Sequence, residues 1–400
     1  MSVWLIEPLD PLIARDGRPA AVGRFTTTGF PYPSMIAGAV RTRMGSENGA
    51  FTLAGNALEE LKEKVHVRGP LLAELSPEDG TVLQWLAPAP RDAVFLQENG
   101  ITARRRLAPR PLESGQAMDS LVEKGLLPIG FQGSRVHGKS PKDIPSFWSW
   151  STFASWLSAP VDQTGVKLAS LGTMSLPVET RAHLALQADE RVGIDGMLFE
   201  TSGLRFLQEG KTRLAPSRFA LSLRCQGATV AGRSLELHEQ IAPLGGERRL
   251  ARWSPASSDW PEMPRNVKEQ IVTSRRARLI LLTPAMFKNG PLPAWNDQSW
   301  PLGAPVRAKV SGAAVPRPEV VSGWDLAADN GAGKPKGRPK PTRRLVAGGS
   351  VYFLNLEGGT AQDVERWCEE TWLACVSDDE QDRRDGFGLA VLGTWEDSKS

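Results

Sequence analysis

A glycine-rich turn followed by two arginines is the sharpest candidate site in this sequence. It reads Gly245-Gly246-Glu247-Arg248-Arg249. Consecutive glycines let backbone amides turn toward one point, and arginine adds charge and a bidentate geometry that suits phosphate. The pattern therefore predicts an anion site formed by the two glycines and the two arginines. An ordinary β-turn with solvated arginines is the alternative.

A second basic group lies near the N-terminus. Its members are Arg15, Arg18 and Arg24 in one loop, with Ser34 and Arg41 on the helix predicted to follow. The Ser34 hydroxyl can cap the first amides of that helix, and a helix start of this kind favours anions. We expect this group to bind the same polyanion as the glycine turn. Pairing with neighbouring carboxylates is the alternative.

The four histidines are His66, His137, His183 and His238, and they are well separated in sequence. General acid–base catalysis needs a second proton-transfer group within reach. His183 is the best placed, on the polar face of a predicted strand beside Arg181, but no such partner is identifiable. Both residues are therefore predicted to contact nucleic acid. Because no P-loop and no paired-carboxylate signature occurs, we expect no catalytic residue, no metal and no cofactor.

Composition bounds these hypotheses. The chain has 400 residues, a formal net charge of +3, and 40% hydrophobic residues, which fits two or three globular domains. So small a charge requires any nucleic-acid site to come from local clustering. The three cysteines show no paired spacing, so neither disulfides nor a zinc knuckle is indicated. Glu7 and Asp10 interrupt any signal peptide, and no apolar run approaches the ~20 residues that cross a bilayer. We expect a cytoplasmic protein without membrane contact.

The elements that would position these residues follow from hydrophobic spacing. Val3–Ile6 predicts a strand, and Ile36, Ala39 and Val40 give the next helix a core face, with Arg41 pointing the other way. Residues 179–187 and 197–206 predict a hairpin, and alternation at 219–223 predicts a closing strand. The first domain would then be 1–233, with 44–176 as an insertion. Within the insertion, 65–145 is expected to be loop-rich, followed by a helix that Ser146 caps.

A second domain, 234–400, is predicted from three strands and one long helix. Leu279–Leu282, Val351–Leu356 and Leu389–Leu392 are apolar runs, and Thr360–Val376 has helical spacing. Between them, 331–344 carries lysine, arginine and proline but no acidic residue. That composition favours a flexible basic loop over 327–344.

The amino-acid sequences of several stretches resemble those of one protein family. WLIEPLDPLIARDGRP followed by FPYPSMIAGAVRT is similar to the opening of the third Cmr subunit of type III-B CRISPR effector complexes, in the RAMP superfamily. The resemblance recurs at 179–206, 244–250, 322–353 and 386–395. It implies an α+β fold of two tandem ferredoxin-like (RRM-like) domains, with the hairpin as a projecting thumb.

The resemblance also implies a function. It indicates a non-catalytic RNA-binding subunit that holds the 5′ handle of the crRNA, with glycine-rich loops lining the RNA path. Its partners would be the large polymerase/cyclase-like Cmr subunit and the backbone RAMP subunits, and target RNA would be met only indirectly. The alternative is a metal-independent RAMP endoribonuclease acting on CRISPR RNA through His183. A third possibility is an adaptor that does not touch RNA.

Overall fold

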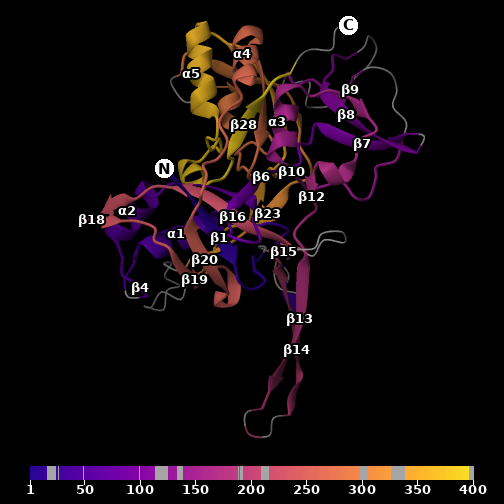
Figure 1. Cartoon of the computed structure of the whole chain (residues 1–400). Coiled ribbons are helices and arrows are strands. Elements are labelled where there is room, and N and C mark those ends of the chain that lie inside the picture. The colour runs from indigo at the N-terminus through magenta and orange to yellow at the C-terminus, as the bar shows by residue number, and fades with distance from the viewer. Residues whose placement is uncertain are drawn as a thin grey trace.

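Two sheets of mainly antiparallel strands organise the chain (Figure 1). The computed structural model describes residues 1–15, 24–25, 27–47, 49–98, 100–112, 125–132, 138–187, 189, 192–208, 216–297, 304–325 and 338–395. None of the helices in these ranges is long and apolar enough to cross a membrane.

The first sheet has nine strands, all paired antiparallel, in the order β12-β10-β6-β5-β16-β1-β20-β19, with β15 beside β16. The strands are β1 (Ser2–Pro8), β5 (Val67–Leu75), β6 (Val82–Pro88), β10 (Phe147–Ser149), β12 (Gly172–Thr173), β15 (Leu207–Gln208), β16 (Ser217–Cys225), β19 (Gln240–Pro243) and β20 (Leu250–Pro255).

This sheet is covered on both faces. On one face, α1 (Pro33–Met44) and α2 (Asn56–Lys64) share a core with Ile6 and Leu72. On the other face, Leu5 and Leu71 join the core of the second sheet. Because both faces are buried, β5 is a nearly continuous apolar run without alternation.

The second sheet runs in the order β22-β27-β21-β28. It comprises β21 (Arg276–Leu281), β22 (Arg307–Ala314), β27 (Val351–Glu357) and β28 (Ala390–Gly393). Helices α4 (Arg265–Ser274) and α5 (Ala361–Thr371) lie side by side over it (Figure 1). Thr360 and Asp363 form a capping box at the start of α5. A short helix, α6 (Glu380–Arg384), leads toward β28.

Six smaller sheets of the described chain surround the two large ones. One comprises β7 (Ala93–Glu98), β8 (Ile101–Pro109), β9 (Ile129–Phe131) and β11 (Gln163–Thr164), near α3 (Trp150–Ser158). The hairpin of β13 (Val178–Leu186) and β14 (Gly193–Leu204) projects far from the body, as predicted (Figure 1). The remaining strands are β2 (Arg24–Phe25), β3 (Ser46–Glu47), β4 (Ala50–Phe51), β17 (Ala228–Val230), β18 (Arg233–Leu235), β23 (Glu319–Val321), β24 (Trp324–Asp325), β25 (Arg338–Pro339) and β26 (Arg343–Leu345).

The fold is α+β, as predicted, but its division differs from the expected one. Strands β19 and β20 pair into the first sheet, so that sheet continues past the predicted boundary at 233/234. Strands β5, β6, β10 and β12 belong to it as well, so 44–176 is not a simple insertion and 65–145 is not loop-rich. Pairing between segments far apart in sequence produced these differences, and local spacing does not show it. Two tandem ferredoxin-like domains are therefore not confirmed.

Two predicted helix caps are also wrong. Tyr32 is the N-cap residue of α1, and no side chain caps the helix; Pro33 begins it and Ser34 lies inside the first turn. Helix α3 begins at Trp150 with Ser149 as its cap, because the residues after Ser146 pair with β6 as β10.

Candidate nucleic-acid interface

An open groove of ≈ 760 Å³ brings five cationic side chains together. Its walls come from the loop after β1, from α1, from the glycine-rich turn and from the segment around β23 and β26. The cations are Arg15, Arg43, Arg248, Lys340 and Arg343. Asp385 is the one carboxylate among the described lining residues. This basic groove has the charge that attracts a polyanion.

The two glycines of the turn seat it against the first loop. The Gly246 amide donates to the carbonyl oxygen of Ile13 at 2.8 Å. A Cβ on Gly245 would lie 2.6 Å from that same oxygen, and the φ of Gly245 is +72°. Only glycine allows this approach and this backbone conformation. The Gly246 amide is therefore bonded within the protein, and both glycines position the turn on the groove wall.

The two arginines of the turn differ in their surroundings. Arg248 is exposed and lines the groove. No carboxylate of the described chain lies within ion-pair distance of it. Arg249 instead pairs with Glu247, with its Nη2 2.9 Å from Oε2, and its side chain is 19% exposed. Of the two arginines in the turn, Arg248 is therefore the one whose guanidinium can contact a ligand in the groove.

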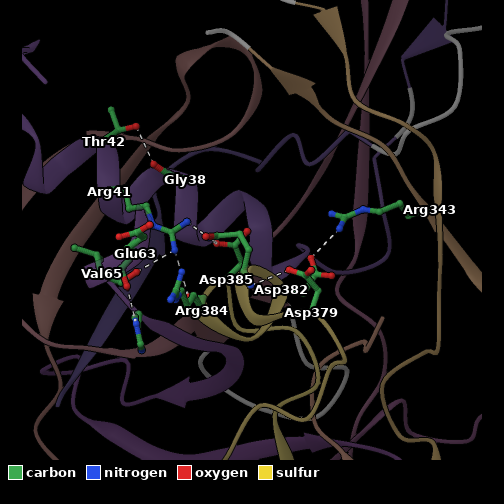
Figure 2. Close-up of polar contacts among 12 residues, drawn as sticks. Gly38, Arg41, Thr42, Glu63, Val65, Arg343, Asp379, Asp382, Arg384 and Asp385 are labelled. Atoms are coloured by element: carbon green, nitrogen blue, oxygen red, sulfur yellow. Dashed lines mark hydrogen bonds and ion pairs between the residues drawn. The ribbon is translucent and has the colours of Figure 1, made fainter. Parts of the chain in front are cut away.

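Helix α1 contributes Ser34 and Arg43 to the groove, but not Arg41. Arg41 is buried, with 8% of its area exposed, so the prediction that it faces away from the core is wrong. Its Nη1 lies 2.5 Å from Oδ1 of Asp385, and its Nη2 donates to the carbonyl of Val65 at 2.9 Å (Figure 2). The residues next to α6 cover this side of α1, which the sequence of the helix does not reveal. The same ion pair compensates the negative charge of Asp385.

Arg343 is held in place by a buried carboxylate. Its Nη1 donates to Oδ1 of Asp382 at 2.7 Å (Figure 2). Burial raises the pKa of Asp382, while the charge of Arg343 opposes that rise. The Arg343 side chain remains 43% exposed. It can therefore meet a ligand while Asp382 orients it.

Part of the predicted flexible loop forms structure on this wall. β26, which contains Arg343, pairs with β23, and β25 pairs with β24. Residues 327–337 lie outside the described residues. Pairing thus places Lys340 and Arg343 in the groove, although the sequence assigned them to a flexible loop.

Arg181 and His183 lie on the hairpin, apart from the groove lining. Arg181 Nε pairs with Glu179 Oε1 at 2.5 Å. The His183 ring stacks on Phe199 with centroids 5.0 Å apart, and its Nε2 lies 2.7 Å from Oγ1 of Thr201. In the part of the chain that the structure describes, these two contacts of the His183 ring are with an aromatic ring and a hydroxyl, whereas a carboxylate is the usual group that orients a histidine for proton transfer.

The remaining predicted residues are accounted for as follows. Arg24 lies in β2, in register with Glu200 of β14, which joins the first loop to the base of the hairpin. Arg18 lies outside the described residues. In the part of the chain that the structure describes, no group of three His, Cys, Asp or Glu side chains could hold a metal. All three cysteines are free and buried.

Three groove residues were missed from the predicted site. Arg43 is not among the predicted site residues, and Lys340 and Arg343 fall within the predicted basic loop but not within the predicted site. The signal was present as a run of basic residues without an acidic one. What was missing was the strand pairing that brings this run to the first loop.

Comparison with known proteins identifies the family. The family model described as CRISPR-associated protein (Cas_Cmr3) matches residues 4–395. No curated protein matches the chain. A chain in the cryo-EM structure of the type III-B Cmr-beta bound to cognate target RNA and AMPPnP, state 1, is 13% identical, with a TM-score of 0.43 and coverage of 88% of this chain and 86% of that chain. A chain of Cmr-beta bound to cognate target RNA gives 13% identity, a TM-score of 0.41 and the same coverage, 88% and 86%. Since the family model spans nearly the whole sequence, this chain belongs to the Cas_Cmr3 family of CRISPR-associated proteins.

Proposed function

We propose that this chain is a non-catalytic RNA-binding subunit of a type III-B Cmr effector complex, and that the basic groove holds the 5′ handle of the crRNA. Family membership supports the assignment to the complex. The observation that carries the RNA site is the gathering of five cationic side chains in one groove. Asp385, the one carboxylate among the described lining residues, is paired with Arg41, and of the five cations Arg343 is itself paired with Asp382. The chain as a whole carries only +3, so this concentration of charge is local.

The groove chemistry suits a single-stranded backbone. Arg43, Arg248 and Lys340 provide donors to phosphate from three separate segments, and arginine can do so bidentately. Hydroxyls of Ser34 and Ser46 lie on the same walls. Contacts of this kind fix the register of an RNA and leave its bases free for other contacts.

The strand orders support a ferredoxin-like origin for both sheets. In β5-β16-β1-β20 and in β22-β27-β21-β28, the strands of each unit follow the spatial order second, third, first, fourth, all antiparallel. We take this as two ferredoxin-like units, each modified by lost or added elements. Between β16 and β20 the chain forms β17, β18 and β19 where a helix is expected, and between β21 and β22 the described residues form only the 3-10 helix Ala294–Asp297.

The hairpin provides a second proposed RNA contact. Arg181 is partly exposed, and the stacked rings of His183 and Phe199 give the hairpin a flat aromatic surface. The opposite face exposes the cross-strand pair of Leu184 and Leu198, at 53% and 64%. A projecting ribbon with exposed apolar residues fits contact with the guide RNA or with neighbouring Cmr subunits.

The test of the groove compares adjacent arginines. Arg248→Ala should weaken crRNA binding by the assembled complex and flatten its salt dependence, because each phosphate contact adds about 0.7 to the log–log slope on single strands. Arg249→Ala is the matched control, since that side chain is already paired with Glu247. If Arg248→Ala leaves the crRNA affinity and its salt dependence unchanged, the handle does not bind in this groove.

The endoribonuclease alternative makes an opposite prediction. It requires purified protein to give discrete products from precursor RNA without metal, and those products to vanish in His183→Ala. We expect no shortening of the RNA by either protein, because His183 bonds to a hydroxyl and lies against an aromatic ring. Gel analysis of end-labelled RNA distinguishes the two functions.

A further inference from the structure

A second cavity, of ≈ 500 Å³, adjoins the basic groove. Tyr32 lines both spaces. The segment 27–32 borders this side cavity and continues as 32–35 along the groove. The segment 318–320 likewise continues as 321–323. The two spaces therefore share walls, and an RNA strand held in the groove would pass the side cavity.

The side cavity has flat apolar surfaces. Phe30, Tyr32 and Phe147 line it, and all three are half-buried. The rings of Phe30 and Phe147 have centroids 5.3 Å apart and an interplanar angle of 50°. Aromatic side chains that are neither fully packed nor fully exposed are the surfaces on which unpaired bases stack.

One carboxylate gives this cavity a hydrogen-bond acceptor. Glu319, at the start of β23, lines the cavity and accepts a hydrogen bond from the Tyr32 hydroxyl. Burial raises the pKa of Glu319, and the Tyr32 hydrogen bond and the charge of Arg91 oppose that rise. When ionised, a carboxylate only accepts hydrogen bonds, and the Tyr32 hydroxyl can donate to one of its two oxygens at a time, so the other oxygen can accept from a ligand.

We infer that the side cavity takes one unpaired base of the RNA in the groove and that Glu319 selects a base carrying an exocyclic amino group, cytosine over uracil. This inference rests on the proposed function. The amino group at N4 of cytosine donates to a carboxylate, whereas uracil presents a carbonyl oxygen at the same position. Two acceptors facing each other repel, so uracil offers no donor to Glu319 and is disfavoured at this position.

The test uses the full-length protein and two matched RNA probes, oligocytidylate and oligouridylate of equal length, in fluorescence anisotropy. The wild-type protein should bind the cytidine probe more tightly by about fivefold, the lower end of a base-edge contact. In Glu319→Gln the preference should vanish, because an amide can donate to uracil as well as accept from cytosine. Phe147→Leu should weaken the binding of both probes by the same factor, so the ratio of the two affinities should not change.

Equal affinity of the wild-type protein for the two probes would overturn the inference, and so would a cytidine preference that survives in Glu319→Gln. These outcomes are separate from the groove itself. Loss of both affinities in Arg248→Ala shows that the groove binds RNA whatever the ratio is. If Arg248→Ala and Phe147→Leu leave both affinities unchanged, the proposed function and the inference fail together. Thermal melting verifies that each variant is folded.

Discussion

Asp92 and Arg278 form an ion pair in which neither side chain has any exposed area. Oδ2 of Asp92 lies 2.5 Å from Nη1 of Arg278. Oδ1 accepts a hydrogen bond from the indole of Trp156 at 2.9 Å, and Arg278 Nε donates to the carbonyl of Thr394 at 2.6 Å. Asp92 follows β6 of the first sheet, and Arg278 lies in β21 of the second. This pair therefore joins the two sheets through their shared core.

Removing one partner should strongly destabilise the protein. Asp92→Ala leaves the Arg278 charge buried without a counter-charge, and we expect the free energy of unfolding to fall by about 3–5 kcal/mol. The control is Glu269→Ala in the Arg265–Glu269 pair, whose side chains are 90% and 61% exposed. That change should alter stability by about 0–1 kcal/mol. Urea denaturation monitored by tryptophan fluorescence measures both, and similar losses would contradict the role given to burial.

Two glycine substitutions should have opposite signs. Gly245→Ala places a Cβ 2.6 Å from the Ile13 carbonyl oxygen at a φ of +72°. We expect a loss of about 1–3 kcal/mol, together with weaker RNA binding as the turn leaves the groove wall. Gly38→Ala lies within α1 with nothing within 4 Å of the new Cβ. It should stabilise the protein by up to about 1 kcal/mol. Calorimetric melting of both variants checks the signs, and stabilisation by Gly245→Ala would show that the turn is not seated as described.

Two arginines on α1 should separate stability from RNA binding. Arg41→Ala removes the counter-charge of Asp385, which keeps only its hydrogen bond from Gln381, and it leaves the Val65 carbonyl without the Arg41 donor. Stability should fall by about 1–3 kcal/mol. Arg43→Ala removes a cation of the groove and should weaken RNA affinity with stability nearly unchanged. Equilibrium unfolding and anisotropy on the same preparations measure the two effects. The reverse pattern would exchange the roles of the two side chains.

The thiols should make the protein less stable in alkali. Burial raises the pKa values of Cys225, Cys368 and Cys375 to about 12. In the unfolded chain, thiols titrate near 8.5. Unfolding between these pH values therefore releases protons, and its free energy falls by about 1.4 kcal/mol per pH unit for each thiol. Cys368→Ala should flatten the measured slope by one such contribution, and an unchanged slope would show that this thiol does not titrate on unfolding.

Reactivity provides an independent check on the same residues. A thiol with a raised pKa has almost no thiolate at pH 8, so the native protein should resist iodoacetamide. In denaturant all three cysteines should be labelled, which mass spectrometry counts. Rapid labelling of the native protein would mean that at least one thiol is accessible and ionised.

Much of the local structure followed from the sequence alone. The hairpin and the apolar strands β21, β27 and β28 are where spacing predicted them, because each is specified by its own residues. Helix α5 begins where it was predicted but ends at Thr371, five residues before the predicted end at Val376. The glycine-rich turn and the first basic loop, both predicted to bind RNA, line the same groove. Gly245 had to be glycine for a reason the sequence could not give, namely the carbonyl of Ile13 that lies against it.

Tertiary structure decided the rest. Strand β5 carries no alternation because both its faces are buried, so its place in the first sheet is visible only from its partners. Arg41 and Arg43 are chemically alike and two residues apart, yet Asp385, which is remote in sequence, holds Arg41 inside and leaves Arg43 on the groove. Likewise, pairing of β26 with β23 carries Arg343 to the groove. A side chain's exposure depends on which distant segment packs beside it, and sequence spacing reports only near neighbours.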